Sequence, residues 1–173
     1  RYESNERSVE KRLPPAPKTE LFTAAEDAIG GVNRRNIIVM RVNHNGEMFL
    51  GSTYVKGSLH NDDLYAKELA RLKELISNPE ESAECPEIEM MDIQMPDGST
   101  RQFRVSKGMI TFQNDRATSY EDYTKAMKLI TTAYKELREE LSSEVFGKPL
   151  AELSDAEMQV IYQAVPMNVS ETE

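Results

Sequence analysis

The fold is decided by the stretch Asn36-Ile37-Ile38-Val39-Met40-Arg41-Val42-Asn43-His44-Asn45-Gly46-Glu47-Met48-Phe49-Leu50-Gly51. Its first half is β-branched and apolar, which is typical of a strand over 37–42. Asn45-Gly46 is a strong hairpin-turn signal, and Met48-Phe49-Leu50 predicts the return strand. A brief further strand is expected over 54–56. We therefore expect the folded domain to begin at Asn36 with an antiparallel hairpin.

Capping and turn residues predict a helix, a second hairpin and a strand after this start. Asn61 begins the helix, apolar side chains recur along it at helical spacing, and Asn78-Pro79 ends it. The segment 88–105 predicts a hairpin, because apolar residues alternate before the turn Pro96-Asp97-Gly98-Ser99. A short apolar strand over 109–112 follows.

The C-terminal third predicts two helices and a last strand. Ser119 begins the longer helix in a capping-box pattern with Asp122, and Gly147 ends it. The apolar stripe of this helix either packs on the sheet throughout, or its C-terminal half meets a partner or a second copy of the chain. A shorter helix is expected over 154–165, and the segment 167–170 is expected to be a short strand.

Helices and strands mix without strict alternation, which favours an α+β fold over a doubly wound sheet. The predicted order is β-β-α-(β-hairpin)-β-α-α-β, with a small mixed sheet and helices packed on one face. Residues 1–35 are interpreted as a tether, because Leu13-Pro14-Pro15-Ala16-Pro17 favours an extended spacer. Residues 36–173 form the expected domain.

Composition narrows the function classes. The 173 residues include 21 Lys and Arg against 30 Asp and Glu, a formal net charge of −9. This balance argues against nucleic acid and anionic membrane surfaces, both of which recruit clustered basic side chains. The longest apolar run, over 36–40, is far shorter than the ~18 residues of a membrane span.

No pattern in the sequence indicates catalysis, a cofactor or a metal site. His44 and His60 are the only histidines, and Cys85 is near neither of them in sequence. Asp115 and Arg116 follow a predicted buried strand and precede a helix cap. They either form a loop that caps this helix or make a polar contact to a partner at the edge of the sheet.

A resemblance emerges from these residues. Gly46-Glu47-Met48-Phe49-Leu50-Gly51 after a strand, then a helix, then 110–116 running into Ser119-Tyr120-Glu121-Asp122-Tyr123, resembles the periplasmic domain of the ExbD/TolR family. That family has a basic-Ala-Asp-basic motif after a strand and a Tyr at the start of the next helix. Asp115 matches the acid of the motif, Arg116 its last basic residue and Tyr120 the Tyr.

The chain also departs from the family pattern. Gln113 stands where the motif has its first basic residue, and Asn114 stands in place of its Ala. The stretch of about 80–107 is an insert relative to the compact family domain, and the helix after Ser119 is longer. Such insert-bearing chains are similar to ExbD-type biopolymer transport proteins of Bacteroidetes.

The resemblance implies a non-catalytic part of an energy-transducing complex. It implies a single-pass protein of the bacterial inner membrane, with a span before residue 1 and this segment in the periplasm. The implied partners are an ExbB-like channel protein, a TonB-like transducer driven by the proton-motive force for outer-membrane uptake, and a second copy in a homodimer. The alternative is a TolR-like anchor that binds peptidoglycan in a Tol-type envelope complex.

Recognition of a partner is expected at a sheet edge. A short terminal strand can recruit another chain by strand addition, because its main-chain groups on one side are unpaired. The candidate edge is the segment 167–170. The candidate interaction residues are Asp115, Arg116, Tyr120, Met167 and Val169.

Overall fold

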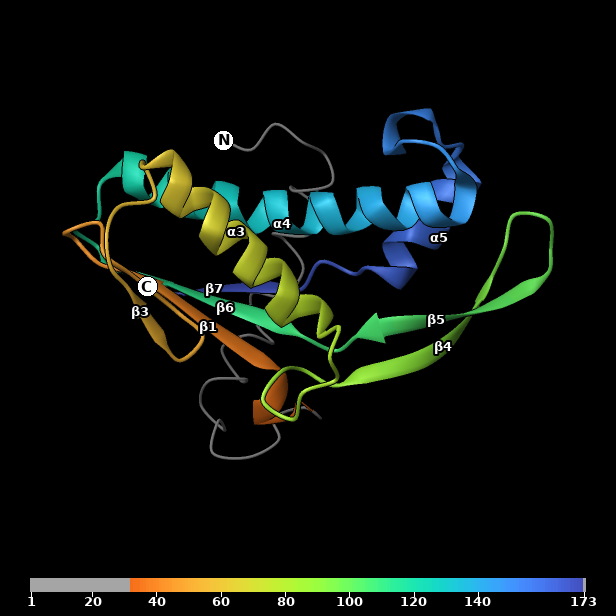
Figure 1. The fold of residues 1–173 in the computed structure, drawn as a ribbon, viewed down its shortest axis with the longest axis horizontal. Coiled ribbons are helices and arrows are strands. Elements are labelled where there is room, and N and C mark those ends of the chain that lie inside the picture. Colours follow the sequence, from red (N-terminus) through yellow and green to blue (C-terminus); the bar gives the residue numbers. More distant parts are fainter. Residues whose placement is uncertain (1–31, 173) are drawn as a thin grey trace.

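A computed structural model describes residues 32–172 and shows an α+β fold, as the sequence predicts (Figure 1). Three α-helices accompany a five-stranded mixed sheet and a two-stranded sheet. In chain order the elements are η1 (Arg34–Asn36), β1 (Ile37–Val42), β2 (Met48–Leu50), β3 (Thr53–Val55), α3 (Asp62–Ser77), β4 (Ile88–Gln94), β5 (Thr100–Ser106), β6 (Met109–Asn114), α4 (Tyr120–Phe146), η2 (Leu150–Glu152), α5 (Asp155–Ala164) and β7 (Val169–Thr172).

The five-stranded sheet has the order β3-β2-β1-β6-β7. β1, β2 and β3 form an antiparallel meander, whereas β6 runs parallel to β1 and β7 runs parallel to β6. Parallel strands that are neighbours need a long crossover connection. Here α3 and the β4–β5 hairpin connect the meander β1–β3 to β6, and α4 and α5 connect β6 to β7. The central strand is therefore β1, and its neighbour β6 is far from it in the chain.

Helices α3 and α4 cover one face of this sheet (Figure 1). Alternate residues of β1 (Ile38, Met40 and Val42) are buried toward these helices, while Arg41 between them is exposed. A main core forms here, and Leu129 and Ile130 of α4 are fully buried in it. The buried face of β1, formed by every second residue, thus packs against the apolar stripe of α4 in one layer.

A second, smaller core joins the β4–β5 hairpin to the C-terminal half of α4 and to α5. Ile93 and Phe103 of the hairpin are buried against Val160 of α5, and Leu141 and Phe146 of α4 pack on the same cluster. Figure 1 shows the hairpin extending beyond the sheet beneath this end of α4. Within the described chain, the apolar side chains in the C-terminal half of α4 are therefore covered by the β4–β5 hairpin and α5.

The N-terminal boundary of the domain is anchored. Arg35 donates from Nε to the carbonyl of Cys85 at 2.7 Å, and buried Asn36 exchanges hydrogen bonds with Glu87. The 3-10 turn Arg34–Asn36 thereby belongs to the folded domain. Residues 1–31 of the predicted tether, with the Pro-rich stretch, lie outside the described residues.

The structure corrects several local predictions. β3 is a full member of the sheet, and the last strand is Val169–Thr172 rather than 167–170. The later start follows from the register: Ile110 donates to the carbonyl of Asn168, so pairing to β6 begins only there. Ser119 caps α4, but the carboxylate of Asp122 bonds His60 instead of completing the predicted capping box.

Candidate functional site

Asp115 lies at the end of the sheet where β1 and β6 both terminate. Its main-chain N–H donates to the carbonyl of Val42 at 3.1 Å. Its carboxylate accepts from the N–H of Ala117 at 3.1 Å and lies 3.2 Å from Nδ1 of His44. The hydrogen bond from Ala117, and then the one from His44, lower the pKa of Asp115, because both favour the charged carboxylate. Asp115 is therefore ionised at neutral pH.

Arg116 and Tyr120 follow Asp115 on the surface. Arg116 is exposed in the turn, and Tyr120, the first residue of α4, is 64% exposed. The predicted trio Asp115, Arg116 and Tyr120 thus occupies one short surface segment between β6 and α4.

Met167 and Val169 lie elsewhere, along the far side of the sheet. Both side chains are partly buried and pack against the main core. Any contact made by this segment to another chain would therefore use its main chain more than these side chains.

The main chain of β7 is suited to such a contact. β7 is the last strand of the sheet order and pairs with β6 in parallel, with Val169 opposite Ile110. In a parallel pair, a residue that bonds to the partner strand bonds to the two neighbours of the residue opposite it. Ile110 donates to Asn168, so the residue opposite Ile110 directs its own N–H and C=O away from β6. The N–H and C=O groups of Val169 and Glu171 therefore point outward from the described sheet.

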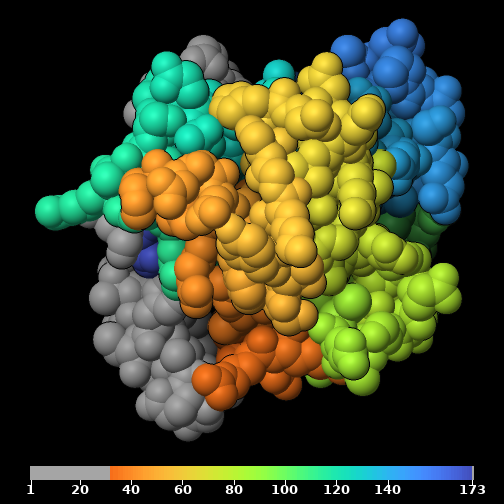
Figure 2. Space-filling model, turned by 60° about the vertical axis from the view of Figure 1, so that its left-hand side comes forward, coloured from red at the N-terminus to blue at the C-terminus, as the bar shows by residue number. Residues whose placement is uncertain are grey.

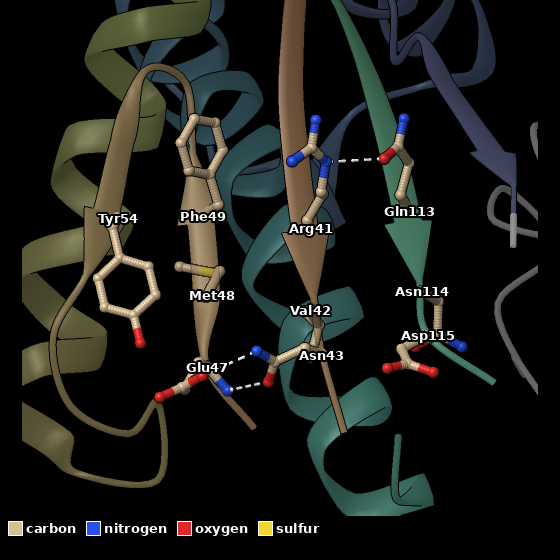
Figure 3. Close-up of a pocket in the computed structure, with 10 residues that line it drawn as sticks. All are labelled: Arg41, Val42, Asn43, Glu47, Met48, Phe49, Tyr54, Gln113, Asn114 and Asp115. Carbon is tan, nitrogen blue, oxygen red and sulfur yellow. Dashed lines mark hydrogen bonds between the residues drawn. The ribbon is translucent and has the colours of Figure 1, made fainter. Parts of the chain in front are cut away.

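A pocket of about 470 Å³ lies near Asp115, over the carboxyl ends of β1 and β6 and the neighbouring β2 and β3 (Figure 3). We call it the sheet-end pocket. It is lined by Arg41, Val42, Asn43, Glu47, Met48, Phe49, Tyr54, Gln113, Asn114 and Asp115. Its volume falls in the range of small-ligand sites.

One row of side chains crosses four strands along this pocket. Register pairs Arg41 with Phe49 and with Gln113, and pairs Phe49 with Tyr54. Nε of Arg41 donates to Oε1 of Gln113 at 2.8 Å, and the guanidinium lies 5.4 Å from the centre of the Phe49 ring. These side chains are on the face opposite α3 and α4, since the alternating neighbours Met40 and Val42 are buried under the helices.

A second set of polar groups lies two residues further toward the strand ends. The carboxylate of Glu47 accepts from Nδ2 of Asn43 at 2.8 Å and from the hydroxyl of Tyr54. These hydrogen bonds, the one from Asn43 first, lower the pKa of Glu47. The pocket therefore has a cation at one level, Arg41, and two carboxylates at the next, Glu47 and Asp115.

A second histidine–carboxylate pair supports the turn beside the pocket. Nε2 of His60 lies 2.8 Å from Oδ1 of Asp122, in the first turn of α4. Gly46, in the β1–β2 turn, lies so close that a Cβ built on it would be 2.7 Å from Oδ2 of Asp122. Figure 2 shows the β1–β2 turn (orange) against the start of α4 (teal).

Metal and membrane features can be judged only over residues 32–172. In that range, no group of three or more His, Cys, Asp or Glu side chains is placed to hold a metal ion. None of the described helices has the length and apolarity needed to cross a bilayer.

The sequence singled out Asp115, which lines the sheet-end pocket, but it did not predict the pocket. Arg41, Phe49, Tyr54 and Gln113 are separated by up to 72 positions and share no motif. The signal that could have found them is polar or aromatic residues alternating with apolar ones on strands 37–42 and 48–50.

Comparison of the chain with protein-family models, curated proteins and solved structures finds no match. The resemblance to the ExbD/TolR family therefore stays a prediction.

Proposed function

We propose that this domain is a non-catalytic interaction module: the periplasmic part of an ExbD-like component in an ExbB–ExbD–TonB complex driven by the proton-motive force. In this proposal a span before residue 1 anchors the chain in the bacterial inner membrane. An ExbB-like channel, a TonB-like transducer and a second copy are its partners.

The observation that carries the proposal is the outward-facing main chain of β7. Strand addition needs an edge strand with N–H and C=O groups that face away from the sheet, and Val169 provides such a residue. β7 is also held firmly, because Val169 packs on the main core and the hydroxyl of Tyr123 donates to Glu171 at 2.6 Å. A rigid edge loses little conformational entropy when a partner strand pairs with it.

A second candidate function is a TolR-like anchor for peptidoglycan. It is favoured by the sheet-end pocket, where three amide side chains, Asn43, Gln113 and Asn114, line a cavity beside Phe49 and Tyr54. Amides and aromatic rings suit uncharged polar ligands such as sugars. The net charge of −9 argues against this candidate, because the stem peptides of the polymer carry carboxylates.

The test is photo-crosslinking in cells of the membrane-anchored protein, with the photoreactive residue at Asn168. This position is exposed and directly precedes β7, whereas the Val169 side chain packs inward. Adducts to a TonB-like protein that disappear when the proton gradient is collapsed are the expected result. Adducts only to peptidoglycan, independent of the gradient, would favour the anchor and overturn the transducer role.

A matched pair of variants tests the strand-addition step. Val169→Pro removes the outward N–H without removing a bond to β6, whereas Val169→Ala keeps that N–H and loses only side-chain packing. We expect the Pro variant to lose most of the adducts and the Ala variant to keep them. Equal crosslinking by both variants would show that the main chain of β7 does not pair with the partner.

A further inference from the structure

The sheet-end pocket divides its charges into two levels along the strands. Arg41 lies at the level of Phe49, Tyr54 and Gln113, and Glu47 and Asp115 lie two residues further on. Strands rise about 3.3 Å per residue, so the two levels are roughly 7 Å apart. Their order is fixed by the register of the sheet.

Groups at both levels remain available to a ligand. Arg41 uses Nε for Gln113, and Figure 3 shows its two terminal nitrogens directed away from that partner. Glu47 is bonded to Asn43 and Tyr54, yet a carboxylate can accept about four hydrogen bonds. The rings of Phe49 and Tyr54 lie alongside and offer apolar surface for an aliphatic stem.

The spacing matches an extended peptide. In an extended chain, side chains two residues apart point to the same face and are also roughly 7 Å apart. An acidic side chain of such a peptide would meet Arg41, and a basic one two positions away would reach the level of the two carboxylates, with Glu47 on the β2 side of β1 and Asp115 on the β6 side. A neutral sugar would gain nothing from this division of charge.

We propose that the sheet-end pocket binds an extended peptide segment of a partner protein that carries an acidic and a basic side chain two residues apart. The site is on the face of the sheet opposite α3 and α4. It is therefore distinct from pairing at the edge of β7, and the proposal stands independently of the transducer function.

The experiment is a titration of the ¹⁵N-labelled 173-residue chain followed by NMR. The probe is an acetylated, amidated five-residue peptide with Glu second, Lys fourth and Thr elsewhere. The control peptide has the same composition with Glu and Lys adjacent, which directs the two charges to opposite faces. We expect the probe to shift amides around 41–54 and 113–115, and the control peptide to bind about fivefold more weakly, as loss of one charge contact implies.

Two Arg variants give a matched comparison. Arg41→Gln removes the cation of the pocket, whereas Arg101→Gln removes a similarly exposed Arg that stacks on Phe103 at 5.3 Å, outside the pocket. We expect about fivefold weaker binding for Arg41→Gln and unchanged binding for Arg101→Gln.

Four outcomes would overturn the proposal. The first is equal binding of the two peptides, and the second is wild-type affinity in a folded Arg41→Gln variant. The third is shifts of the same pocket amides by an uncharged N-acetylglucosamine trimer but not by the probe, which would instead favour the anchor function. Shifts confined to β7 would assign peptide binding to the sheet edge and also exclude the pocket.

Discussion

Substitution of Gly46 by alanine tests the close approach of the β1–β2 turn to α4. Gly46 has φ +78°, a left-handed conformation that costs an L-residue about 1–2 kcal/mol. The added Cβ would also lie 2.7 Å from Oδ2 of Asp122, so the carboxylate must move. Its displacement weakens the contact to His60 at 2.8 Å and the favourable position of the charge at the helix N-terminus.

The expected loss follows from these parts. The contact between partly exposed His60 and Asp122 is worth about 0.5 kcal/mol, and the helix-terminal charge about as much again. With the backbone strain, Gly46→Ala should lower the free energy of unfolding by about 2–3 kcal/mol. For a chain of this size, that lowers the melting temperature by about 5–10 °C.

A matched glycine and a double-mutant cycle separate the causes. Gly98 has φ +91° and no atom within 4 Å of an added Cβ, so Gly98→Ala should cost only the backbone strain of about 1–2 kcal/mol. In urea unfolding, the double variant Gly46→Ala/Asp122→Ala should lose about 1 kcal/mol less unfolding free energy than the sum of the losses of the two single variants. Strict additivity, or equal losses for Gly46→Ala and Gly98→Ala, would refute the close approach.

Four further outcomes follow from the structure. Ser154→Ala should lower the unfolding free energy by about 1 kcal/mol in urea, because it removes one half of the α5 capping box. Phe103→Ala should cost about 3 kcal/mol and speed amide hydrogen exchange in β4, β5 and α5 before β1 and β6, since this ring fills the smaller core. Thr111→Val should raise stability by about 1 kcal/mol in the same urea assay, because the buried Thr111 hydroxyl has no hydrogen-bond partner. The pKa of Asp115 is lowered in the folded state, so the contribution of its carboxylate to stability is present above pH 4 and is lost as the pH falls through the folded-state pKa. Asp115→Asn should therefore make the urea midpoint fall less steeply between pH 5 and pH 3.

Local signals predicted the element boundaries well where a cap or a turn fixes them. Asn61 and Ser154 are the N-caps of α3 and α5, and Gly147 is the left-handed C-cap of α4. Each works through bonds within a few residues, so the sequence alone carries the signal. The start of β7 was wrong by two residues because a long-range register with Ile110 sets it.

The candidate site was only partly predictable for the same reason. Asp115 could be singled out because it follows an apolar strand, but its bond to His44 depends on two strand ends meeting in space. The sheet-end pocket requires the register of four strands, and no pairing of β1 with β6 can be read from local pattern. The smaller core likewise needs α5 to fold back over a hairpin more than fifty positions earlier, as Phe103 and Val160 show.

The parallel pairing of β1 with β6 has a consequence for synthesis. Ile37 pairs with Met109, so β1 and β6 close a loop of roughly 70 residues. At about 5–20 residues per second, β1 waits on the order of 4–14 s on the ribosome before β6 is made. Through that interval, the side of β1 that will pair with β6 is unpaired. The exposed cation Arg41 on that strand then disfavours pairing with a neighbouring nascent chain, since a charged side chain on an open edge opposes aggregation.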